Sequence, residues 1–170
     1  MFSLFSLSLT KLSEVSDRAC RLFLAVCFTA MVSVCLLQVF CRYVLDAALN
    51  WPEELTVYLM AWMTFIGAAV AVKSSEHIAI DILSMSLPPR LRVLLLLTVK
   101  ILTLFIVLYL FKAALGLTGE SASMISDALG VSMVWPRISM PLGAALMALH
   151  LLSMILTDTG KLLKENRQRA

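Results

Sequence analysis

Two adjacent carboxylates, Glu53 and Glu54, stand at the start of a long apolar segment, beside Trp51 and Pro52. Paired carboxylates can act as general acid and base, but neighbouring positions on a helix point about 100° apart and would not share a substrate pocket. Both can instead be solvated at a helix N-terminus, where negative charge is favoured. Alternatively, one of them caps backbone amides or pairs with a basic group of a partner subunit. The tryptophan beside them indicates the headgroup level of a membrane.

Three further ionisable residues, Lys73, His77 and Asp81, recur four positions apart and therefore share one stripe of a helix. The stripe can face water, or it can form a structural clasp that fixes the corner after the second apolar run. A metal site or proton relay would need more ligands nearby, and the only other histidine is His150.

The ionisable residues inside the apolar runs include His150, Lys100 and Lys112, and such groups are functional candidates by default. A single histidine among Ala, Leu and Met is more often hydrogen-bonded to a neighbouring helix, and we favour that interpretation. For Lys100 we expect the side chain to extend to the headgroup layer.

The composition identifies the kind of element that holds these residues. The chain has 170 residues, of which 61% are hydrophobic and 15% charged, and its mean hydropathy is +0.93. Soluble domains carry about 25% charged residues, so we predict an all-α integral membrane protein forming a single membrane domain. Its spans are expected at residues 19–41, 55–72, 91–115 and 134–157. None of these runs contains Asp or Glu, which argues against a proton- or cation-coupled path within this chain.

Lys and Arg are distributed unequally between the two ends of the predicted bundle. Under the positive-inside rule, both termini are therefore cytoplasmic. The cytoplasmic side would hold Lys11, Arg18, Arg21, Lys73, Arg90, Arg92, Lys161, Lys164, Arg167 and Arg169, against Arg42, Lys112 and Arg137 outside.

The segments outside the spans have their own expected roles. The first residues read as a short amphipathic lead-in, and residues 76–87 as an amphipathic helix lying along the cytoplasmic interface before Pro88 and Pro89. The connection at residues 118–136 is the longest outward-facing segment. It is therefore the expected contact surface for a periplasmic partner.

Small residues on the second and fourth runs favour close helix packing. Gly67 and Ala71 are four apart, as are Ala144 and Ala148, and Gly143 precedes the second pair. Small residues let helix backbones approach in lipid. The spacing does not say whether these faces meet each other or a second protein.

The order of these motifs resembles the small membrane subunit of tripartite ATP-independent periplasmic (TRAP) transporters, the DctQ-like family. The resemblance covers about residues 15–160. The motifs that carry it are Trp51–x–Glu53–Glu54, Trp62, Phe65–Ile66–Gly67–Ala68–Ala69, His77–Ile78–x–x–Asp81, Ala128–Leu129–Gly130–Val131–x3–Trp135 and Met140–Pro141–Leu142–Gly143.

The sequence contains no phosphate-binding loop, nucleophile constellation or cysteine metal motif, which indicates an accessory or scaffold subunit without cofactor or enzymatic activity. The resemblance implies a location of this subunit in the inner membrane of a bacterium. Its partners would be a large membrane subunit on a separate chain, which carries the substrate and sodium sites, and a periplasmic substrate-binding protein. The cargo would be an organic acid such as a C4-dicarboxylate or sialic acid. As subunit-interface or structural residues we select Trp51, Glu53, Glu54, Trp62, Gly67, Ala71, Lys73, His77, Asp81, Trp135, Pro141, Gly143, Ala144 and Ala148. As binding-protein contacts we select Glu120, Asp127 and Arg137.

Two other classes of small membrane protein are alternatives. A haem-bearing anchor of a respiratory complex would need two axial histidines at similar depth, for which only His77 and His150 are present. A small multidrug exporter would be expected to have a carboxylate in the middle of the membrane, and the four runs contain none.

Overall fold

A computed structural model describes residues 2–74 and 89–169 of the chain, with side chains over residues 9–74, 91 and 95–160. The elements are α1 (Phe2–Val44), α2 (Trp51–Ser74), α4 (Pro89–Glu120), the 3-10 turn η1 (Ser121–Ser123), α5 (Val134–Arg137) and α6 (Ser139–Arg169). Four stretches are long and apolar enough to cross a membrane: Leu9–Val44, Trp51–Ser74, Leu95–Ser123 and Val134–Gly160. The predicted all-α membrane fold is confirmed. The interfacial helix expected at 76–87, with His77 and Asp81, lies outside the described residues.

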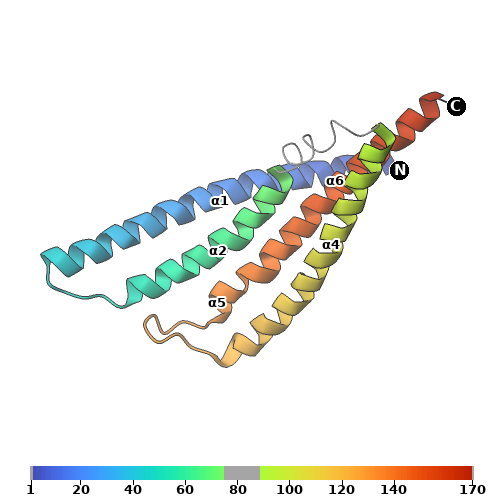
Figure 1. Cartoon of the computed structure of the whole chain (residues 1–170). Helices are drawn as coiled ribbons and strands as arrows, with labels where there is room; N and C mark the ends of the chain where they lie inside the picture. The colour runs from blue at the N-terminus through green and yellow to red at the C-terminus, as the bar shows by residue number, and fades with distance from the viewer. Residues whose placement is uncertain (1, 75–88, 170) are drawn as a thin grey trace.

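The four long helices form a row in the order α1, α2, α6, α4 (Figure 1). The last helix of the chain therefore lies between the second and the third. It also contacts α1, whose N-terminal part passes close to it. Both chain ends lie at the same end of the bundle (Figure 1), which we call the inner end; the opposite end, with α5, is the outer end.

The first helix is longer than the sequence suggested. Instead of a separate lead-in followed by a span at 19–41, α1 runs without a break from Phe2 to Val44. The physical reason is that these residues include no Gly or Pro, the two residues that most readily interrupt a helix.

A proline sets the start of the last helix. Pro141 has no N–H to donate to the carbonyl of Arg137, four residues earlier, and α5 is separated from α6 there. The hydroxyl of Thr118 on α4 is shared between the carbonyl of Ala114, at 2.8 Å, and that same carbonyl of Arg137, at 3.3 Å. The helix start is thereby tied to the outer end of α4.

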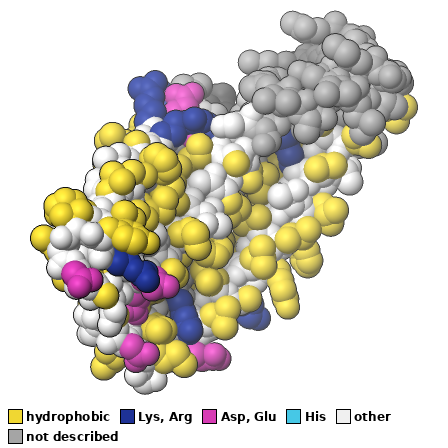
Figure 2. Space-filling view, turned by 60° about the vertical axis from the view of Figure 1, so that its left-hand side comes forward, with side chains coloured by type: hydrophobic (Ala, Val, Ile, Leu, Met, Phe, Trp, Pro, Cys, Tyr) yellow, Lys and Arg dark blue, Asp and Glu magenta, His cyan; other side chains and the backbone are white. Residues whose placement is uncertain are grey.

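The core lies around α6, and most of the remaining surface is apolar. Half of the most apolar stretch of α6 is buried (50%), against 6% for α1. Val107 of α4 packs with Ala144, Ala148 and Leu151 of α6 in one buried cluster. On the face drawn in Figure 2, charged side chains gather towards the ends, with hydrophobic side chains between them. This distribution suits a bundle surrounded by lipid.

Candidate functional site

The outer end is held together by Glu54, in the first turn of α2. Its Oε2 accepts the backbone N–H groups of Ala128 (3.0 Å) and Leu129 (2.9 Å), 74 and 75 residues away. Its Oε1 accepts the hydroxyl of Tyr58, one turn further along α2, at 2.6 Å. Charge-assisted bonds of this kind are about twice as strong as neutral ones. Glu54 therefore binds α2 to the connection at residues 118–136, the outer connection. We call these hydrogen bonds of Glu54 the outer brace.

The neighbouring carboxylate has a different environment. Glu53 is exposed, whereas Glu54 is half-buried. Of the alternatives that the sequence left open for this pair, the structure places the capping of backbone amides on Glu54. Trp51 is half-buried at the start of the same helix.

The three residues selected as binding-protein contacts lie in two environments. Glu120 and Asp127 are exposed. Arg137 is half-buried, and its guanidinium donates to the hydroxyl of Ser121 in η1. Arg137 therefore helps to shape the outer end from within, and the two carboxylates form part of its surface.

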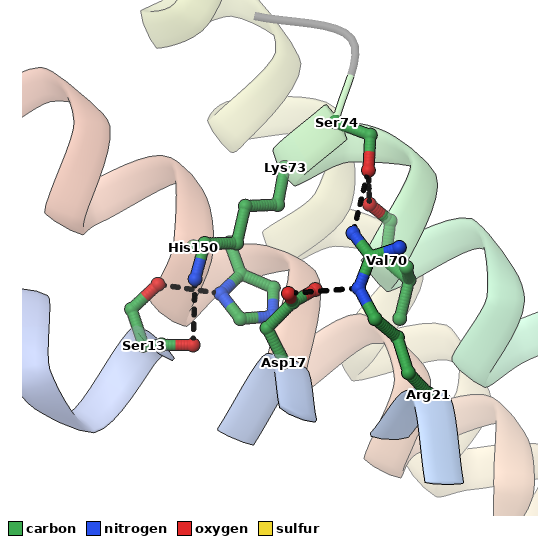
Figure 3. Close-up of polar contacts among 7 residues, drawn as sticks. All are labelled: Ser13, Asp17, Arg21, Val70, Lys73, Ser74 and His150. Atoms are coloured by element: carbon green, nitrogen blue, oxygen red, sulfur yellow. Dashed lines mark hydrogen bonds and ion pairs between the residues drawn. The ribbon is translucent and has the colours of Figure 1, made fainter. Parts of the chain in front are cut away.

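At the inner end, polar side chains of α2 and α6 meet Ser13 of α1 (Figure 3). The Ser13 hydroxyl lies 2.8 Å from Nδ1 of His150 on α6, and the imidazole is fully buried. The ammonium group of Lys73, at the end of α2, donates to the carbonyl of Ser13 at 3.0 Å. The expectation that His150 is hydrogen-bonded to a neighbouring helix is confirmed. We call these three residues the inner clasp.

A second set of contacts extends the inner clasp along α1. Arg21 forms an ion pair with Asp17, one turn before it (Nε to Oδ2, 2.9 Å), and donates to the hydroxyl of Ser74 at 2.9 Å. The Asp17 carboxylate lies beside the imidazole of His150 (Figure 3). The inner clasp therefore joins α1, α2 and α6 through groups that would be costly to bury singly.

Lys100 differs from its expected position. Instead of extending to the headgroup layer, its side chain is buried (6% exposed), and Nζ lies 2.7 Å from Oδ2 of Asp158 on α6. The reason is that this face of α4 is turned to α6, which supplies a carboxylate directly after the fourth apolar run. An ion pair removes the penalty of an isolated charge in the apolar interior.

A close approach between two helices lies between these two ends. A Cβ atom added to Gly143 would stand 2.7 Å from Cβ and O of Phe65, so the backbones of α6 and α2 nearly touch there. A Cβ atom added to Gly67 would instead meet Cδ2 of Leu24 on α1, at an ordinary contact distance of 3.9 Å. Ala71 is exposed, whereas Ala144 and Ala148 are buried against α4. Of the small residues selected from the sequence, Gly143 therefore makes the α2–α6 contact.

The remaining selected residues divide between the interior and the surface. Trp62 packs beside the cluster of Cys20, Ile66 and Val70, and its ring meets that of Phe23 edge-on, with centroids 5.7 Å apart. Pro141 is buried, whereas Trp135 is 67% exposed at the outer end.

The sequence analysis identified Glu54, Lys73, Lys100 and His150, but it did not identify the residues that they contact. Ser13, Asp17, Tyr58 and Asp158 were not singled out. A signal existed for Asp158, because a lysine within an apolar run needs a carboxylate at matching depth. For Ser13 no such signal exists, because a single serine within a helix is common.

The arrangement supplies attachment points between elements of the bundle. Three carboxylates, Asp17, Glu54 and Asp158, each face a hydrogen-bond donor of the same chain. The outer brace and the inner clasp fix elements of the bundle relative to one another at its two ends.

Comparison with known proteins agrees with this geometry. Residues 11–160 match the family described as tripartite ATP-independent periplasmic transporters, DctQ component. The sialic acid TRAP transporter small permease protein SiaQ of Vibrio cholerae is 29% identical over 126 residues, 74% of this chain and 73% of that protein. The sialic acid TRAP transporter permease protein SiaT of Haemophilus influenzae is 33% identical over 121 residues, 71% of this chain but only 20% of the longer relative. The C4-dicarboxylate small permease protein DctQ of Vibrio cholerae is 31% identical over 83 residues, 49% of this chain and 36% of that protein. These relatives are transporter subunits, and the chain belongs to the DctQ family of TRAP transporter small permease subunits.

Proposed function

We propose that this chain is the scaffold subunit of a sodium-coupled importer of organic acids in a bacterial inner membrane, with both termini in the cytoplasm. It would bind a large membrane subunit that carries substrate and sodium, and it would help to receive a periplasmic substrate-binding protein. The cargo class follows from relatives named for sialic acid and C4-dicarboxylates.

One observation carries this proposal. The four apolar runs contain no carboxylate, and three carboxylates at their ends, Asp17, Glu54 and Asp158, bind donors of the same chain. A sodium or proton path needs ionisable or carbonyl ligands that are free to bind and release the ion. These carboxylates instead hold the shape of the bundle, as expected of a scaffold.

A large partner in the membrane is supported by SiaT, in which the matching segment is one fifth of a longer permease. The faces of α1 and α4 that stay exposed are available to such a partner. The selected interface residues that are exposed on the described surface, Glu53, Ala71 and Trp135, remain proposed contacts.

Reconstitution tests the proposed function. Proteoliposomes holding this chain, the large subunit and the binding protein should accumulate a labelled organic acid when a sodium gradient is imposed. Vesicles holding this chain alone should accumulate none. Uptake by the chain alone would contradict the scaffold assignment, and a full system that works equally well without this chain would contradict its requirement.

A further inference from the structure

The outer connection contains a short hairpin whose base and tip are held by different groups. At the base, Ile125 and Ser132 form an antiparallel bridge, and Met133 donates to the carbonyl of Met124 at 2.9 Å. The chain reverses through Gly130, whose φ of +66° favours glycine. These bonds fix where the hairpin begins and ends.

The tip is closed by two backbone bonds of its own, from Gly130 N–H to the carbonyl of Ser126 (3.2 Å) and from Ser126 N–H to the carbonyl of Val131 (2.9 Å), and it is also held from outside the hairpin. The amides of Ala128 and Leu129 both donate to Glu54, whose carboxylate is itself held by Tyr58 at 2.6 Å. Asp127 directly precedes these two amides, and its side chain is exposed. The two amides that follow Asp127 are therefore held by a carboxylate that is distant in sequence and lies on a membrane-spanning helix, in addition to the bonds within the hairpin.

We propose that Glu54 is a positioning residue for docking of the substrate-binding protein, which it serves by fixing the hairpin tip that presents Asp127. This inference rests on the proposed function, because it requires the binding protein to dock on the outer connection. A loop held in its bound conformation avoids the entropy loss of becoming ordered on association. Loss of the brace therefore weakens docking without changing the transport step.

The adjacent carboxylate provides a matched control. Glu53 carries the same charge on the same helical turn, is exposed, and differs from Glu54 in lacking the bonds to the hairpin amides. A general effect of negative charge at the outer end would appear equally at both positions. An effect of positioning appears only at Glu54.

The experiment measures sodium-driven uptake by the reconstituted three-component system while the binding-protein concentration is varied. Glu54→Ala should raise the apparent KM for the binding protein by about two- to tenfold at an unchanged maximal rate. Glu54→Gln should raise it less, because its carbonyl oxygen can still accept both amides. Glu53→Ala should leave the apparent KM for the binding protein at the wild-type value. Hydrogen exchange at the amides of Ala128 and Leu129 should accelerate in Glu54→Ala alone.

The outcomes separate this inference from the proposed function. A KM in Glu54→Ala equal to that of Glu53→Ala overturns the inference, as does a lowered maximal rate with an unchanged KM. If Glu54→Ala does not yield an intact complex, Glu54→Gln and Tyr58→Phe replace it: a raised KM in either supports the inference, and a wild-type KM in both overturns it. A wild-type system without binding-protein-dependent uptake contradicts the proposed function itself.

Discussion

Replacing Gly143 with alanine tests the close backbone contact between α2 and α6. The added Cβ would lie 2.7 Å from Cβ and O of Phe65 and 2.8 Å from its carbonyl carbon. Two of these three atoms belong to the backbone of α2, so no side-chain rotation can make room. The two helices must therefore move apart, although the substitution adds a single methyl group.

The expected magnitude follows from two opposing terms. Adding a methyl group to a packed core costs about 1–3 kcal/mol, and a backbone obstacle places Gly143→Ala towards the upper end of that range. Alanine gains at most about 1 kcal/mol over glycine in helix propensity. We therefore expect Gly143→Ala to lower the free energy of unfolding by about 1–2 kcal/mol.

The assay is unfolding of the purified chain in detergent micelles, followed by tryptophan fluorescence, alongside co-purification with the large subunit. Gly116→Ala on α4 is the matched control, since a Cβ there meets nothing within 4 Å. This control should be neutral or slightly stabilised. If both variants change stability by the same amount, the close approach of α2 and α6 is not what Gly143 provides.

Three further variants probe the rest of the bundle in the same assay. Ser13→Ala should lower stability by about 0.5–2 kcal/mol, because it removes the hydroxyl partner of the buried His150; a wild-type unfolding curve would contradict the inner clasp. Lys100→Met should cost up to about 3 kcal/mol by leaving Asp158 without its ammonium partner. Adding Asp158→Asn should recover most of that loss, and failure to recover would show that the pair is not the cause. Ala144→Leu, at a site 5% exposed, should overpack the contact with α4 by about 1–3 kcal/mol and reduce co-purification with the large subunit; normal recovery and stability would contradict that packing.

The number and type of spanning helices could be predicted because length and composition suffice for them. A run of about 20 apolar residues without charge has few alternatives to a membrane helix. The ends of the helices are less well defined by such a pattern. For example, α4 covers Pro89–Glu120 rather than 91–115, because polar residues can continue a helix beyond the bilayer core.

The partners of the polar residues could not be predicted in the same way. Periodicity within one helix shows which residues share a face, but it does not show which helix that face meets. Ser13 and His150 are 137 residues apart, and nothing local to either residue encodes their contact. Lys100 shows the consequence: its local surroundings favoured an extended side chain, whereas the fold provides Asp158 across the helix interface.

The positions of the polar contacts bear on whether the subunit can move internally during transport. The outer brace holds the start of α2, the inner clasp holds its end, and the backbone contact at Gly143 lies between them. A shift of α2 along its neighbours by one helical turn, about 5.4 Å, would break hydrogen bonds of 2.9–3.0 Å at both ends. It would also drive the side chain of Phe65 past the glycine that accommodates it. A sliding motion inside this chain would therefore disrupt all three contacts together, and this supports the proposal that the bundle remains static while another subunit carries the cargo.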